Sequence, residues 1–126
     1  MASIALNLAA LILFGCGVVH SILGERLLIG PLLHPEKRRG ILAHSPLARQ
    51  TLRFAWHVTS IIWWGVAAIF VVLSLSPINS QDRAILIVVA ITFFIIGLVA
   101  LIASKGRHYS WIAFFIITGL VLVPLF

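Results

Sequence analysis

Ionisable side chains that could bind a ligand or take part in catalysis occur in three short stretches of this apolar chain. These residues are His20, Glu25, Arg53, His57, Arg107 and His108. In a helix, residues four apart lie on the same face, so Arg53 and His57 would belong to one polar stripe. The sequence predicts that the six side chains come together as one polar site.

The charge balance of this predicted site favours an anionic ligand. Glu25 is the one acid close to it, against Arg26, Arg53, Lys105 and Arg107. Burying several like charges is unfavourable unless a counter-charge offsets them, and a phosphate or carboxylate would do so through charge-assisted hydrogen bonds. We therefore expect a lipid head group, a haem or a quinone as the ligand.

His20 and His57 admit further interpretations. Two imidazoles at one depth on adjacent helices could be the axial ligands of a b-type haem, with the arginines pairing its propionates. Together with Glu25 they could instead hold a transition metal. The structural alternative is that the histidines bond each other or a backbone carbonyl and only join two helices.

Composition places these residues in a membrane protein. The chain of 126 residues is 62% hydrophobic and 10% charged, whereas a soluble domain has about 25% charged residues. Four apolar runs, about 4–22, 52–75, 84–103 and 111–126, are each near the length that crosses a bilayer as a helix. The sequence predicts a single transmembrane domain, 1–126, that folds as an all-α, antiparallel four-helix bundle.

Helix punctuation supports this division. Ser45 and Pro46 are typical of a helix start, which would place Arg49 and Arg53 on an aqueous extension of the second helix. Ser80 with Asp82 suits the start of the third helix, and Ser110 suits the cap of the fourth. The one long connection, 24–45, is expected to be cytoplasmic, with its apolar part from Leu27 to Leu33 lying in the membrane interface.

The distribution of positive charge predicts the orientation. Eight of the nine Lys and Arg residues fall on one side of the four spans, and Arg83 alone falls on the other. The positive-inside rule places the eight-residue side in the cytoplasm and both termini in the periplasm. The net charge of +6 is thereby explained by topology and anionic lipids, and a nucleic-acid partner is not expected. Six of the charges are expected to act only in orientation and lipid contact: Arg26, Lys37, Arg38, Arg39, Arg49 and Lys105.

Other classes of function fit the same sequence. A non-catalytic accessory or scaffold subunit of a membrane complex would have helices that are apolar nearly all round, as the third and fourth runs are. A small oligomeric transporter is disfavoured, because the middle of the second, third and fourth helices offers only Ser, Thr and Gly as polar groups. An enzyme is a further alternative, since Glu25 or a histidine could act as a base on a lipid substrate, but no nucleophile motif, paired carboxylates or phosphate-binding loop supports it. Membrane lipids, a second copy or a larger membrane complex are the expected partners.

Three short stretches resemble those of small bacterial membrane proteins of unassigned function. They are His20-Ser21-Ile22-Leu23-Gly24-Glu25-Arg26, Arg53-Phe54-Ala55-Trp56-His57-Val58-Thr59-Ser60, and Gly106-Arg107-His108 with Trp111. The resemblance spans most of the chain. It implies a bacterial inner membrane and no particular activity.

Overall fold

Four helices account for most of the chain. The computed structural model describes residues 1–126, and contains α1 (Ala2–Gly24), α4 (Pro46–Ser74), α5 (Ser80–Ala103) and α6 (Ser110–Leu122). Two shorter helices, α2 (Gly30–Leu32) and α3 (Ile41–His44), lie between α1 and α4, with a 3₁₀ turn at Pro35–Lys37. A second 3₁₀ turn, Val123–Leu125, comes directly after α6. The predicted all-α class is confirmed.

Three of the helical segments are long and apolar enough to cross a membrane. These are the continuous segment Ala2–Leu32, α4 and α5, while α6 with the turn after it, Ser110–Leu125, is shorter. Large apolar side chains on their outer faces are exposed, for example Leu11 at 68% and Ile61 at 59%. Such surfaces would be costly in water, so the helices have the properties of transmembrane helices.

The first helix is longer than the sequence predicts. The apolar pattern predicts an end near Ile22 and a connection from residue 24, but the helix continues to Leu32 through one π-helical turn, Glu25–Ile29. The wider turn accommodates Pro31, which has no backbone N–H to donate. The segment Leu27–Leu33 therefore extends the helix instead of forming a separate interfacial piece, and it buries Ile29 and Leu33.

The predicted helix starts are correct at two positions and wrong at one. Ser45 caps α4, because its hydroxyl accepts a hydrogen bond from the Ala48 N–H at 3.1 Å, and Pro46 is the first helical residue. α5 begins at Ser80 as expected, but its cap is Asn79, which forms a capping box with Asp82. Ser110 does not cap α6, since it already lies inside the helix and its hydroxyl bonds His108.

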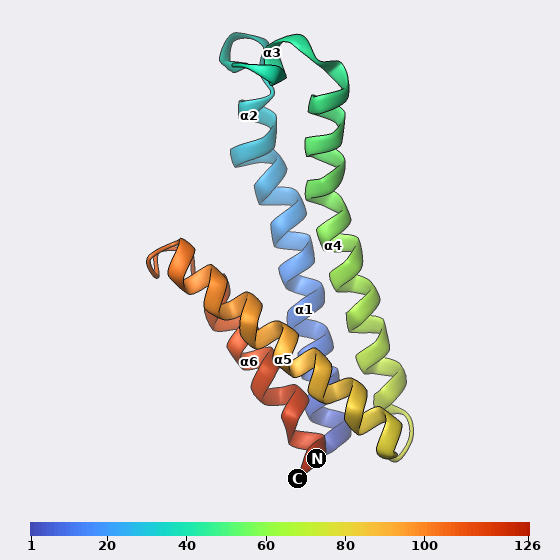
Figure 1. Ribbon diagram of the computed structural model, residues 1–126. Helices are drawn as coiled ribbons and strands as arrows, with labels where there is room; N and C mark the ends of the chain where they lie inside the picture. The colour runs from blue at the N-terminus through green and yellow to red at the C-terminus, as the bar shows by residue number, and fades with distance from the viewer.

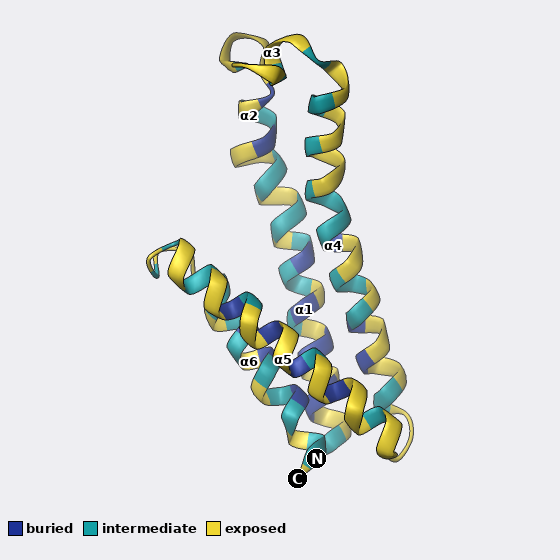
Figure 2. Ribbon diagram, viewed as in Figure 1, coloured by how far each residue is buried: buried dark blue, intermediate teal, exposed yellow.

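The helices form two pairs that share a core near the chain termini. α1 packs along α4, α5 packs along α6, and α6 also packs on α1 (Figure 1). Both termini lie at the end of the molecule opposite the connection between α1 and α4 (Figure 1). The dark, buried positions in Figure 2 concentrate where the two pairs meet. The core residues come from all four long helices: Leu6, Ala9, Ala10, Leu13, Ala67, Phe70, Leu86, Ala90, Phe93, Phe114, Ile117 and Val121.

Toward the other end, α1 and α4 continue together beyond the shared core and are joined by tryptophan–glycine contacts. The Trp56 indole N–H donates to the His20 carbonyl at 3.1 Å, and its ring covers Gly24. Two turns further along α4, the Trp64 indole N–H donates to the Phe14 carbonyl at 3.2 Å, and its ring covers Gly17. Because glycine has no side chain, each ring can lie directly on the α1 backbone. These contacts fix the register between the two helices that carry the predicted site.

Candidate functional site

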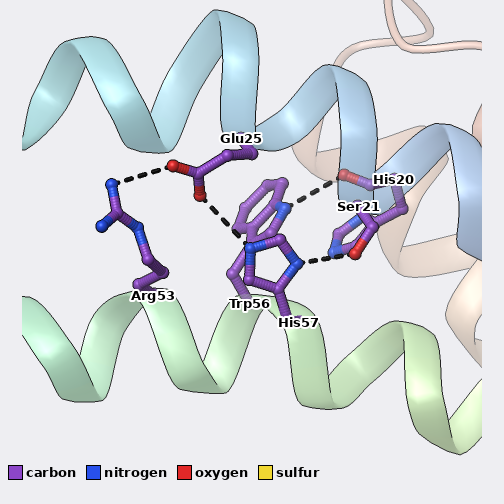
Figure 3. A network of polar contacts seen from close by, with 6 residues as sticks. All are labelled: His20, Ser21, Glu25, Arg53, Trp56 and His57. Atoms are coloured by element: carbon purple, nitrogen blue, oxygen red, sulfur yellow. Dashed lines mark hydrogen bonds and ion pairs between the residues drawn. The ribbon is translucent and has the colours of Figure 1, made fainter.

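A chain of polar contacts centred on Glu25 links α1 to α4. One carboxylate oxygen of Glu25 lies 2.8 Å from an Arg53 guanidinium nitrogen, and the other lies 3.2 Å from His57 Nε2 (Figure 3). His57 Nδ1 in turn lies 2.6 Å from the Ser21 hydroxyl. The side chains are partly shielded, with exposed fractions of 32% for Glu25 and 51% for Arg53. The resulting order is Arg53, Glu25, His57, Ser21.

The partners of His57 determine which of its ring nitrogens carries the proton. An ionised carboxylate can only accept hydrogen bonds, so the Glu25 carboxylate that pairs with Arg53 accepts one from His57 Nε2–H. In a neutral imidazole the other nitrogen is then an acceptor. The Ser21 hydroxyl consequently donates to His57 Nδ1. In this neutral tautomer, His57 is oriented by the Glu25 carboxylate on one side and accepts a hydrogen bond from the Ser21 hydroxyl on the other.

His20 lies beside this chain of contacts and is held by aromatic rings. Its imidazole stacks on Trp56 with the ring centroids 4.3 Å apart and the planes 9° from parallel, and it also contacts Trp63 at 5.1 Å. Its Nε2 is enclosed and has no hydrogen-bond partner. Figure 3 shows the His20 side chain extending from α1 into the space between α1 and α4. The two predicted histidines thus come from adjacent helices but make separate contacts.

This arrangement does not favour bis-histidine ligation of a haem. Both ring nitrogens of His57 are already bonded, to Ser21 and to Glu25. Nε2 of His20 is enclosed, and that ring lies flat on Trp56. The chain also contains no cluster of three or more His, Cys, Asp or Glu side chains that could hold a metal ion.

A positively charged pocket adjoins the polar chain at the end of α4. It has a volume of about 530 Å³, and three arginines, Arg38, Arg49 and Arg53, line it together with His57. Arg38 is held by the Leu33 carbonyl at 2.6 Å, and Arg49 by the Leu42 carbonyl at 2.9 Å. These carbonyls position the guanidinium groups without neutralising them. The pocket therefore contains two positive charges with no acidic partner.

Arg107 and His108 belong to a different cavity. They lie at the turn between α5 and α6, together with His20 and mainly apolar residues of α1, around a cleft of about 740 Å³. His108 Nδ1 lies 2.8 Å from the Ser110 hydroxyl, and both Arg107 and His108 are exposed. The six predicted residues are therefore divided. Glu25, Arg53 and His57 are joined directly, whereas His20, Arg107 and His108 line the cleft.

Sequence reasoning misses several residues of this region. Ser21 is not among the predicted site residues, although its position four residues before Glu25 places both on one face of α1. No pattern identifies Trp56 as the residue that holds His20. Arg38 and Arg49 are predicted to act only in orientation, because nothing in the sequence shows that the connection after α2 folds back toward α4. Their carbonyl contacts depend on that fold.

A comparison of the chain with models of known protein families, with curated proteins and with solved structures finds no match in any of the three.

Proposed function

We propose that this chain is a four-span inner-membrane protein that binds an anionic lipid head group at its cytoplasmic end. The binding residues are those of the positively charged pocket, Arg38, Arg49, Arg53 and His57, with Glu25 holding Arg53 in place. The single observation that carries the proposal is the gathering of three guanidinium groups around one pocket with one carboxylate nearby.

Four spans are supported by the position of α6 and of the termini. α6 with the turn after it is about 24 Å long at 1.5 Å per residue, which is close to the hydrocarbon thickness of a bilayer. It packs on α1, and the Arg83 guanidinium at the start of α5 hydrogen-bonds the Leu125 carbonyl beside the C-terminus. Both termini then lie on one side, and the eight-to-one division of positive charge makes that side periplasmic.

Helix lengths bring the pocket to the level of the head groups. Crossing about 30 Å of hydrocarbon takes about 20 helical residues. Counted from the start of α1, that distance ends just before Glu25, and counted back from the end of α4, it ends near Arg53 and Trp56. Arginine and tryptophan at this level are typical of the membrane interface. The pocket would therefore meet lipid phosphates, not the hydrocarbon.

Two electrostatic features favour a phosphodiester in this pocket. Arg38 and Arg49 have no acidic partner, and arginine forms paired hydrogen bonds with phosphate oxygens. The pocket also contains Pro46, the first residue of the 29-residue helix α4. The N-terminus of a helix carries a partial positive charge, which attracts anions.

Retention of lipid through purification tests the proposal. The protein would be purified in a mild detergent from a membrane containing phosphatidylglycerol, and bound lipid quantified by mass spectrometry. We expect Arg49→Ala to reduce retained anionic lipid by about tenfold, since a hydrogen bond to a charged group contributes about 1.5–3 kcal/mol. Arg49 does not contact Glu25, so its loss leaves the contacts between α1 and α4 intact.

Arg39→Ala is the matched control, because Arg39 is exposed, lies next to Arg38 in the same connection and does not line the pocket. Arg53→Ala should act like Arg49→Ala and should in addition destabilise the protein, because it removes the partner of Glu25. Equal lipid retention by the Arg39, Arg49 and Arg53 variants would overturn the proposal. The positive charges would then serve orientation only, and the accessory-subunit interpretation would stand.

A further inference from the structure

We propose that Ser21, His57 and Glu25 form a nucleophile, a base and an orienting carboxylate that cleave a carboxylic ester of the bound lipid. The inference rests on the proposed function for its substrate, but the reactivity of Ser21 can be measured without any lipid. Ser21 would be the nucleophile, His57 the general base, and Glu25 the positioning residue.

The hydrogen bonds have the polarity that activation of a serine requires. A weakly nucleophilic hydroxyl is activated when an adjacent base accepts its proton and a third group orients that base. Ser21 donates to His57 Nδ1 at 2.6 Å, and Glu25 accepts from His57 Nε2 at 3.2 Å. In the familiar serine–histidine–acid arrangement, the serine contacts Nε2 of the histidine and the acid contacts Nδ1. Here Ser21 contacts Nδ1 and Glu25 contacts Nε2, while the direction of proton transfer is the same.

Ser21 also differs from three threonines within the long helices. Thr59, Thr92 and Thr118 each donate to the carbonyl four residues earlier in their helix, which is the usual contact of a hydroxyl inside a helix. Ser21 makes no such contact, and its one side-chain hydrogen bond is to His57. The serine proton is thus directed to a base on another helix.

The location of Ser21 relative to the pocket selects the substrate bond. His57 lines the positively charged pocket, and Ser21, which is partly exposed, contacts His57. Ser21 lies four residues, about 6 Å along the helix axis, from Glu25 toward the membrane centre. In a glycerophospholipid the carboxylic esters lie on the hydrocarbon side of the phosphate. A phosphate held by Arg49 and Arg53 would therefore place an ester carbonyl at the level of Ser21.

The reaction would proceed in two balanced steps. Ser21 Oγ forms a bond to the ester carbonyl carbon, its proton passes to His57 Nδ1, and the bond from that carbon to the glycerol oxygen breaks as the oxygen takes the proton from His57. Water then attacks the acyl group on Ser21, giving one proton to His57, which returns it to Ser21 Oγ as the fatty acid leaves. The net change is hydrolysis of one ester by one water.

The chain contains a matched control for this arrangement. Ser110 also hydrogen-bonds a histidine, with its hydroxyl 2.8 Å from His108 Nδ1, but no carboxylate pairs with His108. A serine–histidine contact alone would make the two serines equally reactive. An orienting carboxylate would make Ser21 reactive and leave Ser110 inert.

The experiment is labelling of the full-length protein in detergent with an alkyl fluorophosphonate, which bonds an activated serine oxygen to phosphorus and releases fluoride. Peptide mass spectrometry should find the adduct at Ser21 and not at Ser110. Ser21→Ala should abolish labelling, and His57→Gln should slow it by about 100-fold, the lower range of general-base contributions. Glu25→Gln should lower the maximal labelling rate without changing the reagent concentration that gives half of it.

Vesicles of phosphatidylglycerol provide the second readout. The unmodified protein should release fatty acid from them, and Ser21→Ala should not, while both retain the lipid equally. Absence of an adduct on the unmodified protein, or equal adducts on Ser21 and Ser110, would overturn the inference even where lipid retention still depends on Arg49. Conversely, an adduct at Ser21 together with unchanged lipid retention in Arg49→Ala would support the nucleophile and refute the head-group pocket.

Discussion

Replacing Gly17 with alanine should separate α1 from α4 at one point. A Cβ atom at Gly17 would lie 2.5 Å from Trp64 Nε1, whereas ordinary contact begins at 3.4 Å, so the indole must move by about 0.9 Å. The Trp64 N–H already lies 3.2 Å from the Phe14 carbonyl oxygen. A displacement of that size away from α1 takes the pair beyond hydrogen-bonding distance.

The expected cost can be worked out from these contacts. Overpacking of a well-packed contact costs about 1–3 kcal/mol, and loss of an interhelical hydrogen bond in a membrane protein costs about 0.6–2 kcal/mol. The greater helix propensity of alanine returns about 1 kcal/mol. We therefore expect Gly17→Ala to lower the free energy of unfolding by about 0.6–4 kcal/mol. Reversible unfolding in mixed detergent and dodecyl sulfate micelles, monitored by far-ultraviolet circular dichroism, measures this value.

Gly15→Ala provides the matched control two residues earlier in the same helix. A Cβ at Gly15 would meet no atom within 4 Å, so this variant should be neutral or slightly more stable. In a Trp64→Leu background the two alanine variants should behave alike, because the indole that causes the clash is gone. If Gly17→Ala is as stable as Gly15→Ala in the unmodified background, the close contact between Trp64 and the α1 backbone does not exist.

Three further outcomes are expected. Gly24→Ala should displace Trp56 in the same way and, because His20 stacks on that ring, should change its side-chain NMR signals, whereas Gly65→Ala, with open space around it, should not. Asn79→Ala should cost about 1 kcal/mol of unfolding free energy by removing the cap of α5, and Gln81→Ala, whose side chain makes no capping contact, should cost less. Alkaline phosphatase fused after the C-terminus should be active in bacteria, and an active cytoplasmic reporter there would reverse the proposed orientation.

The sequence predicts the parts of the fold that depend on local patterns. Apolar run lengths locate the long helices, and the Ser45-Pro46 pair locates the start of α4, because caps and burial are set by neighbouring residues. The predicted end of the first helix is wrong, since Gly30-Pro31 usually terminates a helix. Here a π turn accommodates Pro31 within the helix. The accompanying burial of Ile29 and Leu33 is tertiary packing, which no local pattern reveals.

The sequence identifies Glu25, Arg53 and His57 as candidates, but it does not identify Ser21 or show how the side chains are arranged. The order of the spans places His20, Glu25 and His57 at a similar depth on two adjacent helices. Depth does not determine rotation about the helix axis, and rotation decides that Glu25 and Ser21 meet His57 while His20 meets Trp56. It also decides that Arg107 lines the separate cleft against α1. Rotation is fixed by the glycine–tryptophan contacts, which are pairwise and therefore invisible when each helix is considered alone.

The π turn that begins at Glu25 affects both the polar contacts with α4 and the arginine pocket. A π turn holds one residue more than an α turn, so it rotates the later part of the helix relative to the earlier part. Glu25 is its first residue, and the Gly30 N–H bonds the Glu25 carbonyl across the turn. A side chain at Gly30 would lie 2.8 Å from that carbonyl oxygen, so the turn requires glycine there. Up to the start of the turn, Ser21 and Glu25 lie on the face toward His57. From the end of the turn onward, Ile29 and Leu33 are buried, and the following connection brings Arg38 to the pocket. A regular α-helix through Ile29 would shift that second set of contacts by one residue relative to Ser21 and Glu25.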